Sequence, residues 1–277
     1  RESTTLCRPT RRPHHPGCPP LLLRAMANAA NVHGPPPTQP MGLFRCGQCC
    51  SSKGDPNEAM DTYAIGSSHL NDEKPTVGEK NNNFTGDQLE ERPETEVEAG
   101  AKYKGQWKGN QCHGHGILSR PDRSSYEGSF VNGRAHGHGT FIATNGNIYE
   151  GQWDQDRAHG HGKYIHVDGS TYEGQWLKDD KSGRGVENWA DGARYEGEFL
   201  DGRKHGDGVY NSGTGVMFTG QFRNDKMDGE GYYKFIDGRQ YTGHWQGGHM
   251  TGKGQMEWPN GSKYEGYYEK DVKHGEG

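Results

Sequence analysis

The chain has 277 residues, of which 29% are hydrophobic and 45 are glycine, about twice the average share of glycine. So polar a composition excludes an ordinary globular core, while the 8 Phe, 6 Trp and 14 Tyr are too many for a wholly disordered chain. The net charge of −5 divides into +4 for residues 1–40, −7 for residues 41–100 and −2 for residues 101–277. The largest part is therefore nearly neutral, which argues against nucleic acid as a partner.

Residues 1–40 are rich in Pro and Arg and have no periodic pattern, so we predict a disordered segment, or one that is not translated if the chain begins at Met41. The apolar run Leu21–Leu23 ends at Arg24 and is too short for a signal peptide. No run in the chain approaches the length of a transmembrane helix.

Residues 41–50 form a candidate acylation segment. If translation begins at Met41, Gly42 becomes the N-terminus after removal of the methionine and resembles a myristoylation site. Cys46, Cys49 and Cys50 stand close enough to add a palmitoyl group, and two acyl chains anchor a protein stably where one does not. We therefore predict association with the cytoplasmic face of a membrane.

Two other interpretations of residues 41–50 stay open. With an upstream start, these cysteines lie in a disordered tail and have no role. A zinc site is the second alternative, although Cys46-x-x-Cys49 is only half of one and no second pair follows at finger spacing. Residues 51–100, which are polar and acidic, are predicted to be a disordered linker.

Residues 101–277 contain an internal repeat of 23 residues. Aromatic residues open near-identical pentapeptides of the form Tyr-Glu-Gly-Gln-Trp, at Tyr103, Tyr126, Tyr149, Tyr172, Tyr195, Phe218, Tyr241 and Tyr264. A Gly-x-Gly follows each opener after eleven residues, and Asn-Gly or Asp-Gly pairs recur near position 20 of most units. Such pairs between apolar runs are typical of hairpin turns.

Each unit is predicted to form two short antiparallel strands, the second of which begins at Gly-x-Gly. Side chains alternate along a strand, so the Tyr, Gly and Trp of the opener share one face. The recurrent glycines are expected to leave room for rings of the neighbouring strand. The fold class is therefore all-β, an elongated single-layer antiparallel β-meander of hairpin repeats, with seven full repeats and a truncated eighth in residues 101–277.

The ring that closes each pentapeptide lies two positions beyond the first glycine. These second rings are Trp107, Phe130, Trp153, Trp176, Phe199, Phe222, Trp245 and Tyr268. Together with the openers they are expected to form the core, and they are also candidates for the wall of a groove that holds a helix or an extended peptide. Direct contact with lipid headgroups is a third role, which the near-neutral charge of the array disfavours.

The opener, the following His-Gly-x-Gly and the junction Asp168-Gly169-Ser170-Thr171-Tyr172 together resemble the MORN repeat family (membrane occupation and recognition nexus). The resemblance covers residues 103–277. It implies an elongated, twisted single-layer sheet with a groove, and roles in scaffolding, membrane apposition, and protein or phospholipid binding. Repeats four and five depart from the pattern at Ser182, Glu187 and residues 211–215, where a looser array is expected.

The leading prediction is a non-catalytic scaffold or tether that binds a protein partner in the groove. In some relatives such an array precedes a phosphatidylinositol phosphate kinase or lysine methyltransferase domain, so a regulatory array of a larger enzyme is one alternative. A phospholipid-binding module is another. Open sheet ends also suggest a homo-oligomer joined edge to edge.

No catalytic, cofactor-binding or metal-binding residue is predicted within the array. The histidine pairs such as His136/His138 repeat every two strands, about 9–10 Å apart, which is too far for one ion to join adjacent repeats. No segment with a helical period follows any Gly-x-Gly, although a phosphate loop requires a helix there. Only one of the six cysteines, Cys112, lies in the array, which indicates a reducing, cytoplasmic setting.

Overall fold

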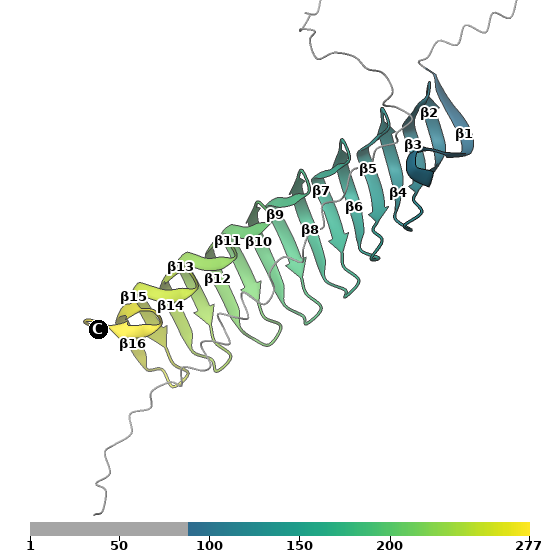
Figure 1. Ribbon diagram of the computed structural model, residues 1–277. Coiled ribbons are helices and arrows are strands. Elements are labelled where there is room, and N and C mark those ends of the chain that lie inside the picture. The colour runs from purple at the N-terminus through teal and green to yellow at the C-terminus, as the bar shows by residue number, and fades with distance from the viewer. Residues whose placement is uncertain (1–87) are drawn as a thin grey trace, which may run out of the picture.

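A computed structural model describes residues 88–277, which form one continuous antiparallel sheet of 17 strands. Consecutive strands pair with one another, and the array is elongated, with β1 at one end and β16 at the other (Figure 1). The strands are β1 Leu89–Glu96, β2 Lys102–Lys108, β3 Gln111–Ser119, β4 Ser125–Val131, β5 Arg134–Ile142, β6 Ile148–Asp154, β7 Arg157–Ile165, β8 Thr171–Leu177, β9 Asp180–Asn188, β10 Arg194–Leu200, β11 Arg203–Asn211, β12 Met217–Arg223, β13 Lys226–Lys234, β14 Gln240–Gln246, β15 His249–Glu257, β16 Lys263–Glu269 and β17 Val272–His274. A short 3-10 turn, η2, spans Glu98–Gly100. No helix among these residues is long and apolar enough to cross a membrane.

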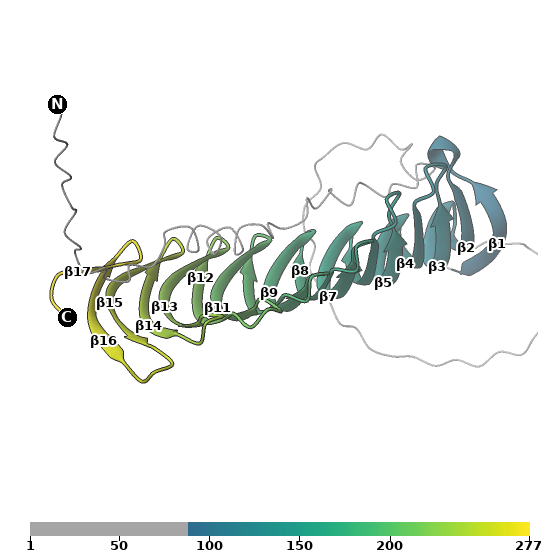
Figure 2. The same cartoon turned by 90° about the horizontal axis from the view of Figure 1, so that it is seen from below.

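The predicted all-β meander of hairpins is confirmed, but the predicted start of the second strand is wrong. In repeat three that strand, β7, begins at Arg157, three residues before Gly160. The pairing of β6 with β7 shifts between Gly151 and Trp153, so that several residues of β7 lie opposite Gln152. Gly160 therefore lies within the strand, at an irregularity where φ is +64°. The same shift recurs along the array and accompanies the strong curvature of the strands (Figure 2).

The two glycines of Gly-x-Gly have different roles. A Cβ on Gly162 would lie 2.3 Å from the Tyr149 hydroxyl oxygen, so the tyrosine ring of the first strand covers this glycine as expected. A Cβ on Gly160 would instead lie 2.1 Å from Oε1 of Gln152. That amide oxygen accepts a hydrogen bond from the backbone N–H of His161 at 2.7 Å, so it satisfies a donor at the irregularity. The first glycine thus makes room for a glutamine and the second for a ring.

The predicted rings form a continuous aromatic ladder, defined here as the eight openers and the eight second rings. All of them are buried except Tyr264, which is half-buried. Tyr149 contacts Trp153 of its own repeat and Trp176 of the next at centroid distances of 5.0 and 5.2 Å, both edge to face. This alternation runs without a break from repeat one to repeat eight. Edge-to-face pairs each contribute about 0.5–1.5 kcal/mol beyond their buried area, so the ladder couples each repeat to its neighbours.

Two kinds of turn join the strands. Gln155 and Asp156, between β6 and β7, both have positive φ, as two-residue hairpin turns require. The predicted Asn-Gly and Asp-Gly turns form the other kind and join each repeat to the next. In one of them the N–H of Ala143 donates to the carbonyl of Asn147 at 2.8 Å, which encloses a three-residue loop with Gly146 at positive φ.

The first strand lies in a segment that the sequence predicted to be disordered. Residues 89–96 form β1, so the predicted boundary at residue 101 is wrong for this part of the linker. The strand is polar, but it pairs with the edge of β2, and its Arg92 guanidinium lies 5.0 Å from the ring centre of Trp107. Charged residues and Pro93 make this a well-protected edge strand. Backbone pairing and one cation–π contact hold this strand in place of buried apolar side chains. Because sequence patterns detect strands by such apolar side chains, they did not predict this one.

The departures in repeats four and five do not open the sheet. The loop at residues 211–215 keeps the outer hydrogen bond from Ser212 N–H to the Val216 carbonyl at 3.0 Å, and Ser212 Oγ also accepts from Val216 N–H at 3.1 Å. Glu187 is buried in an ion pair with Lys181 and lies 3.7 Å from Lys204 Nζ. We expected a looser array at Glu187 and at residues 211–215. That expectation is wrong, because polar contacts hold both places in the sheet.

Candidate binding groove

The face of the sheet opposite the aromatic ladder is hollowed along repeats one to six. In each first strand the residues between Tyr, Gly and Trp, such as Glu173 and Gln175, point away from the rings. One hollow of about 740 Å³ extends from His115 to Glu173, and a second of about 800 Å³ extends from His161 to Gly220. Because His161 and Glu173 line both, the two hollows are continuous, and we call them together the polar groove.

The floor of the polar groove is made of paired glycines. Gly151 lies opposite Gly162, and Gly174 lies opposite Gly185, in the register of adjacent strands. On the other face the tyrosine rings lie against these glycines, which explains why no larger residue occupies the positions. In the polar groove the same positions carry no side chain between two rows of side chains, and Gly151 and Gly162 are half-buried there, so another backbone could approach closely.

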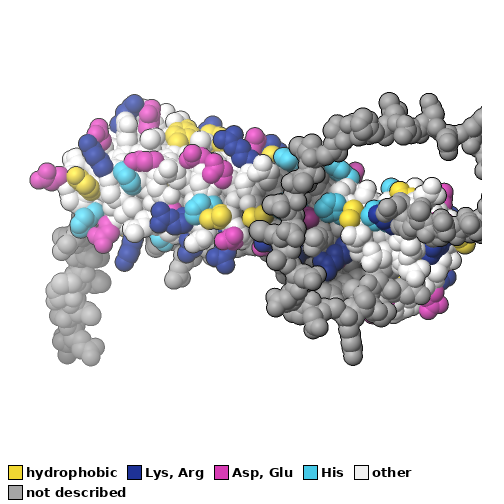
Figure 3. Space-filling view, turned by 90° about the horizontal axis from the view of Figure 1, so that it is seen from above, with side chains coloured by type: hydrophobic (Ala, Val, Ile, Leu, Met, Phe, Trp, Pro, Cys, Tyr) yellow, Lys and Arg dark blue, Asp and Glu magenta, His cyan; other side chains and the backbone are white. Residues whose placement is uncertain are grey.

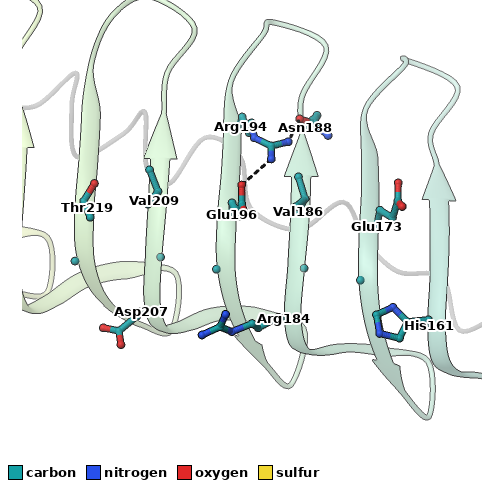
Figure 4. Close-up of a pocket in the computed structure, with 15 residues that line it drawn as sticks. His161, Glu173, Arg184, Val186, Asn188, Arg194, Glu196, Asp207, Val209 and Thr219 are labelled. Atoms are coloured by element: carbon teal, nitrogen blue, oxygen red, sulfur yellow. Dashed lines mark hydrogen bonds and ion pairs between the residues drawn. The ribbon is translucent and has the colours of Figure 1, made fainter.

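Two rows of charged and histidine side chains form the walls of the polar groove. One wall is a row of glutamates, one from each first strand of repeats two to five: Glu127, Glu150, Glu173 and Glu196. The other wall comes from the second strands, and its members are His115, His138, His161, Arg184 and Asp207. Figure 4 shows Glu173 and Glu196 at the same level on β8 and β10, in a row that crosses the strands, with His161, Arg184 and Asp207 below them.

The charges of the polar groove are only partly paired. Glu196 Oε2 lies 2.7 Å from Arg194 Nη2, and Glu173 Oε2 lies 3.7 Å from Lys163 Nζ. Within residues 88–277 neither Glu127 nor Glu150 is in an ion pair. The lining contains five carboxylates against three lysine and arginine side chains, so the polar groove is acidic overall when its histidines are neutral.

The structure assigns the predicted aromatic residues to the core and not to a groove wall. None of the sixteen rings lines either hollow. The prediction that rings serve as groove wall is therefore wrong for the polar groove, because alternation places them on the opposite face, where the curved sheet buries them. Burial raises the pKa of tyrosines along the ladder, to about 12 for Tyr268, and it does the same for Tyr233 on the second strand of repeat six.

A buried charged cluster interrupts the apolar contacts on the ring face. Lys181, Glu187 and Lys204 have side chains that are only 4–7% exposed. Lys181 Nζ lies 4.8 Å from the ring centre of Tyr172, and Lys204 Nζ lies 4.8 Å from that of Trp189. Burial lowers the pKa of Lys204, although the nearby Glu187 carboxylate acts in the opposite direction. In repeat seven the positions of Lys181 and Glu187 hold Met250 and Met256, both buried.

Sequence reasoning missed the contacts between hairpin turns. Asp156 Oδ1 accepts the N–H of Ala135 from the preceding repeat at 2.8 Å, and Asp179 does the same for Ala158. A recurrent Asp at the second turn position was the available signal, in repeats three, four, six and eight. These aspartates link each hairpin to its predecessor, at positions where positive φ favours Asn, Asp or Gly.

No group of three or more side chains in residues 88–277 is arranged to hold a metal ion. Cys112 is buried. The candidate acylation residues Gly42, Cys46, Cys49 and Cys50 lie outside the described residues.

These features define a repeat protein built from a single sheet, with a buried aromatic face and an open polar face. The MORN repeat model matches the chain at residues 103–125, 126–148, 149–171, 172–194, 195–217, 218–238, 241–263 and 264–277. The chain therefore belongs to the MORN repeat family.

Among solved structures the chain is similar to the TCP domain of Drosophila melanogaster SAS-4, in complex with a proline-rich motif of Ana2. The identity is 13%, the match covers 56% of this chain and 85% of that one, and the TM-score is 0.36. A mutant TCP10 domain of Danio rerio CPAP is 14% identical over 63% of this chain and 88% of its own, with a TM-score of 0.34. The chain matches no curated protein sequence.

Proposed function

We propose that the array is a scaffold that binds a segment of a partner protein along the polar groove. The observation that carries this proposal is the division of labour between the two faces. The rings hold the repeats together, while the opposite face has a floor of glycines between a row of glutamates and a row of histidine, arginine and aspartate side chains. A surface with repeated, outward-facing polar groups suits a long ligand that contacts several repeats in turn.

The regular core also suits a ligand that binds along several repeats, because it keeps the sheet rigid. A rigid sheet loses little conformational entropy when a ligand binds, so more of the contact energy appears as affinity. The same groove would suit a regulatory array of a larger enzyme, in which the bound segment comes from a catalytic domain. In both cases the array acts by binding.

A lipid surface is a less suitable ligand for this face. Anionic headgroups are attracted by clustered Lys and Arg, whereas the polar groove has an excess of carboxylates. The visible part of the surface in Figure 3 carries both signs of charge interspersed, with only small hydrophobic areas. These features support a protein ligand.

Site-specific photo-crosslinking tests the proposal. A photoreactive residue at Thr140, in the polar groove, should crosslink a defined partner in cells, whereas one at Val167, an exposed loop residue outside both hollows, should not. A second groove position, Thr219, should capture the same protein. Equal crosslinking from Val167, or none from either groove position, would refute a groove-bound partner.

We also propose that acylation at Gly42 and a neighbouring cysteine tethers the array to a membrane. The sequence of residues 41–50 supports this, because a second acyl chain beside the first makes anchoring stable. A chain expressed from Met41 should incorporate a myristate analogue, and Gly42→Ala should abolish the label. Replacing Cys46, Cys49 and Cys50 by Ser should leave the myristate label and release the protein from membranes. An unlabelled wild-type chain would contradict the tether.

A further inference from the structure

The glutamate row of the polar groove has a fixed period. One glutamate is contributed by every second strand over repeats two to five, which corresponds to a spacing of about 9–10 Å. Each glutamate lies beside a pair of floor glycines, with the wall of histidine, Arg184 and Asp207 side chains on the far side. A ligand in the groove therefore meets a carboxylate at regular intervals.

We propose that the polar groove binds an extended partner segment in polyproline II conformation, with Lys or Arg at every third residue facing the glutamate row. This inference rests on the proposed function and specifies its ligand. Charge complementarity selects the basic residues, because carboxylates outnumber lysine and arginine side chains in the lining and Glu127 and Glu150 have no ion pair among residues 88–277.

The repeat spacing selects the conformation. A polyproline II segment has three residues per turn and advances about 9.3 Å in three residues, so every third side chain points the same way and stays close to the spacing of the glutamates. Seven residues of an α-helix, the nearest helical match, advance about 10.5 Å and drift out of register faster. A β-strand places every third residue on the opposite face, so it cannot present a basic side chain to each glutamate.

The floor and the walls suit such a backbone. A polyproline II segment makes no internal hydrogen bonds, so its carbonyl groups need partners in the groove or in water. Ser129, His138 and Thr140 line the first hollow and provide polar side chains there. The paired glycines leave the floor free of side chains, so the segment can approach the sheet closely.

The test measures binding of synthetic peptides to the full chain. The probe is a peptide of about 12 residues with Arg at every third position and Pro between them, a composition that favours polyproline II. One control peptide has the same composition with its arginines contiguous, and a second is helical with Arg at every seventh residue. We expect the periodic peptide to bind at least about fivefold more tightly than either control, and more weakly as salt is added.

Matched variants locate the site. Glu127→Gln with Glu150→Gln should weaken the periodic peptide about five- to twentyfold, because each exposed ion pair contributes modestly. Glu265→Gln is the control, since Glu265 holds the same position in the last repeat but lies outside both hollows and pairs with Lys253. All three side chains are exposed, so each variant should keep the circular dichroism spectrum of the wild-type chain.

Three results would overturn the inference. The first is equal or tighter binding by the clustered or the helical peptide. The second is equal weakening by Glu265→Gln, which would mean attraction by overall charge alone. The third is failure of the periodic peptide to bind while Thr140 still crosslinks a partner, in which case the groove binds protein of a different chemistry and the proposed function stands.

Discussion

Replacing Glu187 by Met should destabilise the array at its centre. Glu187 is the carboxylate between the buried Lys181 and Lys204, and its side chain is only 7% exposed. Methionine fills a similar volume and is the residue at this position in repeat seven, where Met256 is buried. The substitution therefore removes the charge without leaving a large cavity, so its cost reports the electrostatics of the cluster.

The magnitude follows from the two lysines that remain. Removing one partner from a buried ion pair costs about 3–5 kcal/mol, because the other charge is left without compensation. Here two ammonium groups stay behind, and their ring contacts at 4.8 Å are present with and without Glu187, so these contacts offset none of that cost. We expect a loss of about 3–5 kcal/mol in the free energy of unfolding of repeats four and five.

A compensated variant separates charge from packing. Replacing Lys181 and Lys204 by Met as well removes every charge of the cluster, and the buried Met227 and Met250 hold the position of these lysines in repeats six and seven. Exchanging a buried ionic cluster for apolar residues is often neutral or stabilising by about 1–4 kcal/mol. The triple variant should therefore be at least as stable as the wild-type chain.

Urea denaturation of residues 88–277, monitored by circular dichroism, measures both variants. Hydrogen exchange should show the loss in Glu187→Met concentrated in repeats four and five, because repeats contact only their neighbours. A loss below about 1 kcal/mol for the single variant, or a triple variant as unstable as the single one, would refute the electrostatic reasoning.

Three other perturbations test the packing of the array. Gly162→Ala should cost about 1–3 kcal/mol in denaturation experiments, since its Cβ would lie 2.3 Å from the Tyr149 hydroxyl; Gly231→Ala should cost about as much, and equality with wild type would contradict the ring-over-glycine packing. Asp156→Ala should cost about 1–3 kcal/mol because the buried N–H of Ala135 loses its acceptor, and Asp156→Asn should restore most of it, whereas a lack of rescue would point to charge instead. Raising the pH above 10 should unfold the array. Burial raises the pKa of its tyrosines, so the stability they contribute is present below their unfolded pKa near 10 and is lost as the pH rises through the folded values, about 12 for Tyr233 and Tyr268. Tyrosinate absorbance should then rise together with the loss of circular dichroism, and complete ionisation with the fold intact would be the contrary result.

The period of the sequence predicted most of the fold. Rings and glycines that return every 23 residues predicted hairpins, their antiparallel order and the residues of the core. The room that Gly162 leaves for a ring was also predictable, because a glycine that recurs in a strand indicates a close approach. These features depend on residues of the same strand or of adjacent strands. The sequence of a single repeat is therefore enough to predict each of them.

What failed depends on contacts between repeats or on the shape of the whole sheet. The sequence of β1 is polar and lacks the alternation of apolar and polar residues that marks a strand. Only its pairing with the edge of β2 shows that it is one. Glu187 looked like a defect in the repeat, and only the positions of Lys181 and Lys204 show that its charge is paired. Each depends on a neighbour that no local pattern specifies.

The sequence by itself determined that this chain builds a long antiparallel sheet from MORN repeats, because a fixed phase of rings and glycines leaves strands no other register that buries them. Only the tertiary structure decided which face is available for binding. The strand alternation placed rings and charges on opposite faces, but it was the curvature of the sheet that buried the rings and left the polar groove, with its glutamate row, open to a ligand.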